Sequence, residues 1–357
     1  MKKSLIALAV LAASGAAMAQ SSVTLYGLID TYYANAKWDR GNGVTAPSHA
    51  VATGYAGTTQ NLIQSGAVNG SRWGLKGSED LGGGLKANFV LEAGINSDTG
   101  AGASALAFHR QASVGFSGGF GAVRLGRVPT YYYDTEGTWD GMFNSALSAA
   151  AVAFRTPSGG DVSFEKSNLV SRYDNSVRYD SPNFSGFSGS VQYGFTENKT
   201  TSVDAGANWS LGATYAAGPL SAGLAYQQQK ATDTAETVSN TRLGASYDFG
   251  VAKLKASYGI AGNVGAVKDA KATEYQIAVD YPVSSALTVS ANFARSSDSK
   301  ELDPGESVRN AFGIGAAYTL SKRTFLYGGY VSGKKSSNGS KDDATISALA
   351  VGVQHRF

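Results

Sequence analysis

The sequence predicts an all-β protein, a 16-stranded antiparallel transmembrane β-barrel, on three observations. From residue 22 to the last residue, short segments alternate apolar and polar side chains, which is typical of strands with one apolar face. No later segment has the roughly 18 uninterrupted apolar residues that a membrane helix requires. The segments are joined alternately by tight turns and by longer polar loops, as in barrels that cross a membrane.

The chain begins with the pattern of an export signal over residues 1–19. Two lysines precede an apolar run over residues 5–11, and Ala17-Met18-Ala19 has the small residues of a cleavage site. The apolar run is too short to span a membrane. We expect this signal to be removed, and residues 20–357 to form a single barrel domain, because no linker or shift in composition divides them.

Composition narrows the possible functions. The chain has 45 glycines, 19 tyrosines, 7 prolines and 16% charged residues, which suits tight turns and aromatic girdles at a membrane interface. Without cysteine it has neither disulfides nor a thiolate metal site, and we expect no metal or cofactor. The formal charge of +3 is too small to indicate nucleic-acid binding.

The first expected strand, residues 23–34, is followed by a long polar stretch to about residue 68. The later strands are expected in pairs. They cover residues 71–77 and 85–95, 108–116 and 122–126, 172–180 and 187–195, 209–216 and 220–229, 241–249 and 252–262, 273–281 and 287–295, and 310–320 and 324–331, with 345–357 last. The turn within each pair carries Gly, Pro or Ser, as tight hairpins do.

The faces opposite the apolar ones are too polar for a dry protein core. They carry Thr24, Arg72, Lys76, Lys86 and Glu92, among others. A soluble β-sandwich or β-helix would have to bury these groups, whereas a barrel of about sixteen strands is wide enough to hold water. The pattern therefore favours the membrane barrel over these alternatives.

Two segments resemble the general trimeric porins of Gram-negative bacteria, most closely those of beta-proteobacteria. Residues 71–87, SRWGLKGSEDLGGGLKA, are similar to the second hairpin of that family, and residues 120–127, FGAVRLGR, to its fifth strand. The start, SVTLYG at residues 22–27, and the terminal Phe357 fit as well. The resemblance extends over essentially the whole mature chain.

The resemblance implies an outer-membrane channel for passive diffusion of small hydrophilic solutes and ions. It also implies a homotrimer, contact with outer-membrane lipid and lipopolysaccharide, and a third loop that folds inward to narrow the pore. The alternating final strand with Phe357 at its end resembles the signal that the outer-membrane assembly machinery recognises. His355 stands where the family more usually has an aromatic residue.

The connection over residues 127–170 is far longer than the roughly 4–6 residues of a median connection. It carries Asp134, Glu136 and Asp140 near its start and two further carboxylates at residues 161 and 165. If it folds inward, some of these groups face the barrel wall and form the acidic side of a constriction. The alternative is an ordinary external loop with solvated acidic residues.

Alternation places a basic wall opposite this loop. Where Trp73, Leu75, Tyr173, Val177 and Tyr179 face outward, their polar neighbours face the lumen. The wall then comprises Arg72, Lys76, Arg124, Arg172 and Arg178. A charged side chain that faced lipid near mid-membrane would instead be destabilising by about 2–4 kcal/mol.

Arg110 is a special case. It shares parity with Ala112 and Val114, so simple alternation would turn it outward. The resemblance nevertheless matches it to a constriction arginine, and a bulge between Arg110 and Ala112 would reconcile the two.

The wall cations slightly outnumber the nearby carboxylates, and we expect a slight preference for anions. A substrate-specific channel with a saturable site is the alternative function, suggested by the consecutive Tyr131, Tyr132 and Tyr133. An enzyme is not expected, because none of the three histidines has a Ser, Asp or Glu at a spacing that suggests an activated nucleophile.

Overall fold

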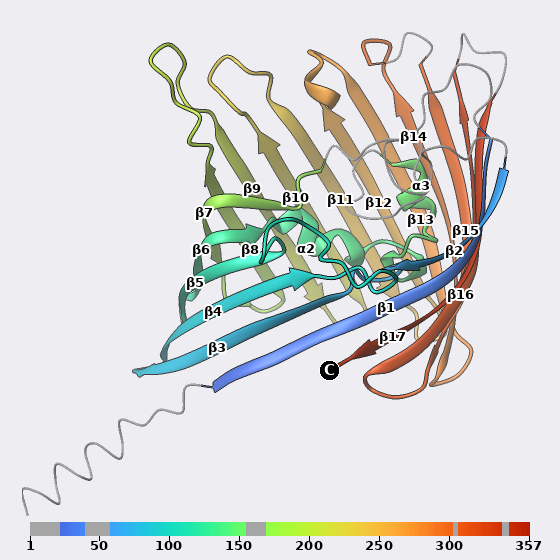
Figure 1. Ribbon diagram of the computed structural model, residues 1–357, viewed down its shortest axis with the longest axis horizontal. Helices are drawn as coiled ribbons and strands as arrows, with labels where there is room; N and C mark the ends of the chain where they lie inside the picture. Colours follow the sequence, from blue (N-terminus) through green and yellow to red (C-terminus); the bar gives the residue numbers. More distant parts are fainter. Residues whose placement is uncertain (1–21, 40–57, 155–168, 303–305, 338–342) are drawn as a thin grey trace, which may run out of the picture.

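The strands form one closed sheet that wraps around a lumen, and a connection between two of them folds into that lumen (Figure 1). This computed structural model describes residues 22–39, 58–154, 169–302, 306–337 and 343–357. The expected export signal and the carboxylates at residues 161 and 165 lie outside the described residues. The all-β barrel that the sequence predicts is confirmed.

All pairs of neighbouring strands are antiparallel, and from β3 onward each strand pairs with the next along the chain. The sheet contains β1 Ser22–Asp39, β2 Thr58–Ser65, β3 Arg72–Gly82, β4 Leu85–Gly94, β5 Gln111–Gly118, β6 Gly121–Pro129, β7 Arg172–Asp180, β8 Phe187–Phe195, β9 Ala207–Ala217, β10 Leu220–Gln229, β11 Val238–Asp248, β12 Lys253–Gly262, β13 Lys271–Pro282, β14 Leu287–Asp298, β15 Val308–Thr319, β16 Thr324–Ser336 and β17 Ala344–Arg356. Long connections lie at one end of the barrel and short turns at the other (Figure 1).

The seventeen strands occupy sixteen positions around the barrel, because β2 and β3 share the position beside β1. β2 pairs with Thr31–Trp38 and β3 with Ser22–Leu28. β1 also pairs with β17, which closes the sheet. β2 was not expected, because its sequence TTQNLIQS is mostly polar and shows no clear alternation. β1 extends five residues beyond its predicted end at residue 34.

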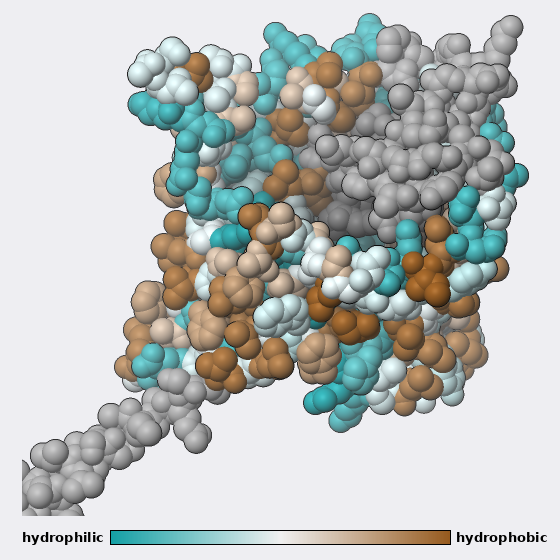
Figure 2. Space-filling view, viewed as in Figure 1, coloured by the Kyte–Doolittle hydropathy of each residue, from teal (hydrophilic) through white to brown (hydrophobic). Residues whose placement is uncertain are grey.

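The outer face of the barrel is apolar and exposed, whereas the inner face is mixed. Outward residues in the middle of strands, such as Leu243, Ile277 and Val114, are more than half exposed. Hydrophobic side chains dominate the lower part of the face in Figure 2, and hydrophilic ones are more frequent toward the top. No helix in the described part of the chain is long and apolar enough to cross a membrane.

The connection between β6 and β7, residues 130–171, is here called the internal loop. Its described parts contain α2 Tyr131–Thr135, η1 Glu136–Thr138, η2 Met142–Asn144 and α3 Ala149–Ala153. The Tyr131 amide donates to Ser210 on β9, and the Ala149 amide donates to Asn292 on β14. Because Ser210 and Asn292 belong to the inward faces of their strands, the loop lies inside the barrel. One further short helix, η3 Val264–Ala266, follows β12.

One sector of the lumen is filled by a hydrophobic core. α3 and its neighbours Leu147 and Phe154 pack there against small inward residues of β14 to β17, including Ala294, Ala311 and Ala348. This packing holds the part of the internal loop around α3 and leaves the opposite sector, lined by β3 to β7, polar.

A charge on the outer face should destabilise the barrel according to its depth. Leu243→Arg, in the middle of β11, is expected to lower the free energy of unfolding by about 2–4 kcal/mol. Val251→Arg, in the short turn after β11, should lower it by only about 0–1 kcal/mol. Urea unfolding in phospholipid vesicles, followed by tryptophan fluorescence, measures both. Equal losses would contradict this orientation of the wall.

Candidate functional site

Three arginines, on β3, immediately before β5 and on β7, meet beside the internal loop. The Arg172 guanidinium lies 4.6 Å from the centre of the Tyr133 ring, and Arg110 Nη2 lies 3.4 Å from the Tyr133 hydroxyl oxygen. Glu92 on β4 accepts from Arg110 Nε at 2.7 Å and lies 3.8 Å from Arg72 Nη1. Three cations and one carboxylate therefore surround a single phenol, and we call this group the arginine cluster.

Main-chain carbonyls and Glu92 orient the arginine cluster. Arg72 Nε donates to the Gly70 carbonyl at 2.9 Å, and Arg172 Nε donates to the Arg110 carbonyl. The Arg110 guanidinium is held by Glu92, whose other oxygen accepts from the Tyr26 hydroxyl at 3.0 Å. Since each guanidinium has a fixed acceptor, its charge stays at a defined position.

Arg110 reaches the lumen because it precedes its strand. β5 begins at Gln111, and its pairing with β4 is regular from that residue onward. A bulge over Ala112 is therefore not needed. Gln111 also turns inward, toward Ser113, and the alternation is broken where the strand starts.

Tyr173 faces inward, which corrects the outward orientation expected for it. Between Gly126 and Val128 the register of β6 and β7 shifts by one residue, and Asn175 has a φ of +48°. The bulge turns Tyr173 into the barrel, where its hydroxyl lies 3.0 Å from the Trp209 carbonyl oxygen and 2.9 Å from that of Gln228. Arg172 is the first residue of β7, where the alternation of the strand begins.

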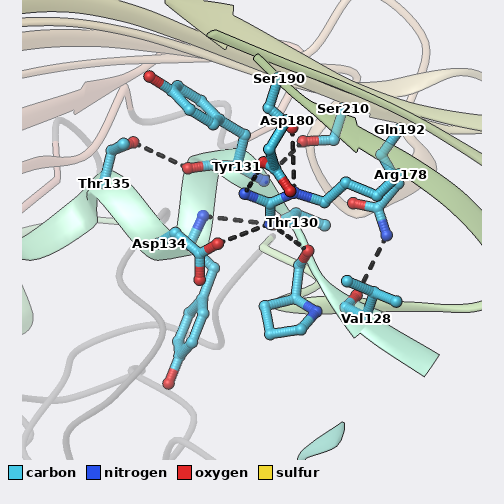
Figure 3. A network of polar contacts seen from close by, with 12 residues as sticks. Val128, Thr130, Tyr131, Asp134, Thr135, Arg178, Asp180, Ser190, Gln192 and Ser210 are labelled. Carbon is cyan, nitrogen blue, oxygen red and sulfur yellow. Dashed lines mark hydrogen bonds and ion pairs between the residues drawn. The ribbon is translucent and has the colours of Figure 1, made fainter. Parts of the chain in front are cut away.

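Arg178 fastens the start of the internal loop to the wall. Its guanidinium contacts Asp134 of α2 at 2.6 Å, Asp180 at 2.8 Å and the Pro129 carbonyl at 2.7 Å, as Figure 3 shows. Arg178 is only 3% exposed. It is thus buried behind the loop, whereas alternation alone predicts that it lines the water-filled lumen.

The remaining wall cations lie apart from the arginine cluster. Arg124 pairs with Asp180 at 2.5 Å, so Asp134, Asp180, Arg124 and Arg178 form a set of two positive and two negative charges. Lys76 is exposed, and its ammonium lies 5.1 Å from the centre of the Tyr26 ring.

Glu136 and Asp140 are turned away from the arginine cluster and buried, 5% and 4% exposed. Both interact electrostatically with Arg242 on β11, whose guanidinium lies 4.8 Å from the centre of the Tyr132 ring. Asp140 Oδ1 accepts from the Ser148 hydroxyl and from the Gly141 amide, both at 2.8 Å. Burial raises the pKa of Asp140 to about 6.

A third buried arginine holds the end of the described loop. Arg309 on β15 donates to the Ala153 carbonyl at 2.9 Å and pairs with Asp298 at 2.6 Å. Arg242 and Arg309 were not among the predicted residues. The alternation that placed Arg124 would have found them, since Leu243 and Val308 flank them as apolar neighbours.

Two pairs of glycines on the wall leave space for two side chains of the internal loop. Gly223 and Gly244 are cross-strand partners, and a Cβ on either would meet the Trp139 indole. Gly315 and Gly329 are likewise partners, and a Cβ on either would meet the end of Met142. Trp139 and Met142 are almost completely buried, so the absent side chains allow the loop to lie close to the wall.

The arginine cluster opens onto a cavity of about 540 Å³. Its lining includes Arg72, Arg110, Tyr133 and Asp134, together with residues 66–70 from the chain between β2 and β3. Tyr131 and Tyr132 are buried against the wall, which leaves Tyr133 as the member of the tyrosine run that reaches the cavity. No group of metal-ligating side chains occurs among the residues described.

The last residue completes the seam of the barrel. Phe357 exchanges two main-chain hydrogen bonds of 3.1 Å with Gly27 on β1. Its side chain is 46% exposed.

Known proteins resemble the chain over its full length. The sequence profile of the Gram-negative porin family matches residues 5–338. Outer membrane porin protein 32 of Delftia acidovorans is 38% identical over 374 residues, which cover 99% of this chain and 94% of that protein. An outer membrane porin protein of Bordetella pertussis is 33% identical, with 100% of both chains covered.

A solved structure agrees with these relatives. An anion-selective porin from Comamonas acidovorans superposes with a TM-score of 0.74 at 30% identity, over 95% of this chain and 100% of that one.

A side chain added at one of these glycines should weaken the attachment of the internal loop. Gly244→Ala would overlap the Trp139 indole, and such overpacking lowers the free energy of unfolding by about 1–3 kcal/mol. Gly259→Ala on β12 is the matched control, because its Cβ would meet Thr241 and Glu274 and no atom of the loop among its nearest neighbours. Thermal unfolding of both variants tests this, and equal midpoints would contradict the claim that the loop needs a glycine at residue 244.

Asp140 should make the barrel more stable in mild acid. Its pKa is about 6 when folded and 3.8 in the unfolded chain. The folded state therefore binds more protons between these values, so stability rises as the pH falls from 7 toward 4. Asp140→Asn should remove roughly 1–3 kcal/mol of this pH dependence. Urea unfolding at pH 7 and pH 4.5 measures it, and unchanged pH dependence would be the opposing result.

Proposed function

The chain belongs to the Gram-negative porin family, and from this premise we propose that the arginine cluster is the selectivity element of its channel. The protein is an outer-membrane channel for passive diffusion of small hydrophilic solutes and ions. The proposal concerns where the channel is narrowed and which charge its solutes meet there.

The observation that carries the proposal is the local balance of charge. Arg72, Arg110 and Arg172 face one carboxylate, Glu92, which leaves a net charge of +2 beside the cavity. Asp134 does not offset it, because Asp134 and Asp180 together balance Arg124 and Arg178.

The other carboxylates in the described part of the loop contribute to its attachment. Glu136 and Asp140 are buried beneath the loop, near Arg242, and Lys255 donates to the Asp140 carbonyl while pairing with Asp280. Among the residues that the structure describes, the constriction that we propose thus has a positive side without an equally negative one. This supports a preference for anions, and the related porin from Comamonas acidovorans is itself described as anion-selective.

The expected selectivity is moderate. Two charges about 8 Å from a passing monovalent ion change its free energy by roughly 1 kcal/mol at the dielectric of water, so an anion is enriched about fivefold and a cation is depleted by the same factor. Because dissolved salt screens charges over about 10 Å at 0.1 M, the preference should weaken as salt rises.

Reversal potentials in planar lipid bilayers under a KCl gradient test the selectivity element. The native channel should favour chloride, and the Arg72→Gln and Arg172→Gln double variant should shift the potential toward cations. Arg323→Gln is the control, since Arg323 is exposed in the short turn between β15 and β16. An unchanged potential in the double variant would refute the role of the cluster.

General diffusion is preferred to a saturable substrate site. A ladder of exposed aromatic side chains would support specific binding, yet Tyr131 and Tyr132 are buried and only Tyr133 of that run lines the cavity. Solute flux that rises linearly with concentration is the expected result, and saturation by one class of solute would favour the specific channel. We propose no enzymatic activity.

The proposal extends to the export, membrane insertion and oligomeric state of the channel. We propose export by residues 1–19, insertion guided by the terminal strand with Phe357, and a trimer in outer-membrane lipid and lipopolysaccharide. An apolar groove on the outer face, lined by residues such as Ile63, Leu326 and Val351, supports contact with lipid or a neighbouring copy.

A further inference from the structure

The wall beside β1 is interrupted by an inward turn. Ser65 of β2 pairs with Thr31 and Arg72 of β3 pairs with Leu28. Residues 66–71 therefore lie opposite only residues 29–30 of β1. Because this segment is longer than the part of β1 that it faces, it has to leave the sheet. We call residues 66–71 the lumenal turn, and it begins at Gly66 with a φ of +86°.

A buried carboxylate on β1 holds the lumenal turn. Asp30 Oδ2 accepts from the amides of Val68 at 3.1 Å and Asn69 at 2.9 Å, and from Gln354 Nε2 at 3.1 Å. Its Oδ1 accepts from the Tyr327 hydroxyl at 2.5 Å. Asp30 is fully buried, and no ion pair to it is found within the described part of the chain. Such a carboxylate is stable only if neutral donors satisfy it.

The main chain of β1 joins the same network. The Asp30 amide donates to the Ser71 hydroxyl at 2.9 Å, and the Gly66 amide donates to the Asp30 carbonyl at 2.9 Å. Both ends of the lumenal turn and its middle are thus bonded to one residue. Through Tyr327 and Gln354 that residue also contacts β16 and β17.

The lumenal turn contacts both sides of the cavity. The Gly70 carbonyl orients Arg72, as described above, and the Ala67 carbonyl accepts from the Ala146 amide of the internal loop at 2.6 Å. Residues 66–70 themselves line the cavity. A displacement of the turn would therefore move one wall of the opening and release one of its arginines.

We propose that the lumenal turn is a second constriction element, beside the internal loop, and that Asp30 is its positioning residue. The turn sets the free cross-section on its side of the opening and the direction of the Arg72 guanidinium. This inference rests on the proposed function, because it assumes that the cavity at the arginine cluster is the narrow part of the channel.

A cysteine in the turn tests the first half of the proposal. The chain has no native cysteine, so Asn69→Cys can be modified selectively with an anionic methanethiosulfonate reagent. Ser284→Cys, in the exposed short turn between β13 and β14, is the control. Modification of Asn69→Cys should lower single-channel conductance in a step and shift the reversal potential toward cations, while the control stays unchanged.

Two substitutions of Asp30 separate geometry from charge. Asp30→Asn keeps an oxygen for the turn amides, and its amide group can donate to the Tyr327 oxygen. Asp30→Glu keeps the charge, but the added methylene displaces the carboxylate. A positioning role predicts native conductance and anion preference for Asp30→Asn, and altered conductance with a reduced anion preference for Asp30→Glu.

The outcomes distinguish this inference from the proposed function. If the native protein forms no pore, or a pore without selectivity, the proposed function fails. If the pore is native but verified modification of Asn69→Cys leaves conductance unchanged, the lumenal turn is not a constriction element. Changes in Asp30→Asn but not in Asp30→Glu would show that Asp30 acts by its charge. If either variant does not fold, the Asn69→Cys measurement, which leaves Asp30 intact, still decides the first half.

Discussion

Closure of the sheet between β1 and β17 is the constraint on which the rest of the molecule depends. In a membrane every strand must find hydrogen-bond partners on both sides, because lipid offers none. Phe357 and Gly27 complete this seam with a reciprocal pair of hydrogen bonds. Once the sheet is closed, its outer face must be apolar, whereas its inner face is free to carry charge. The internal loop, the buried arginines and the cavity all follow from that freedom.

The interior is divided between attachment and transport. Arg178, Arg242 and Arg309 lie behind the internal loop at successive places along it, and each interacts with a carboxylate or a carbonyl of the loop. A hydrophobic core holds the part of the loop around α3. Because attachment uses the carboxylates of the loop's described part, the described surface beside the cavity is positive.

The proposed constriction lies where the regular pairing and alternation of the strands are interrupted. Arg110 enters the lumen ahead of its strand, and Arg172 stands at the first position of β7, where a bulge turns Tyr173 inward. The lumenal turn lies where β2 ends and β3 begins. A regular strand presents side chains to one face only at every second position. Irregularities therefore bring extra polar groups to one level of the lumen, at the expense of regular pairing there.

The sequence alone determined the barrel, the number of strand positions and the face on which Arg72, Lys76 and Arg124 lie, because alternation is a local property that lipid enforces at every strand. Only the tertiary structure decided which charges meet. Asp140 and Arg242 are about a hundred positions apart, and Asp30 and Gln354 stand near opposite ends of the chain. Their pairing depends on closure and on how the internal loop and the lumenal turn pack, which no local pattern records.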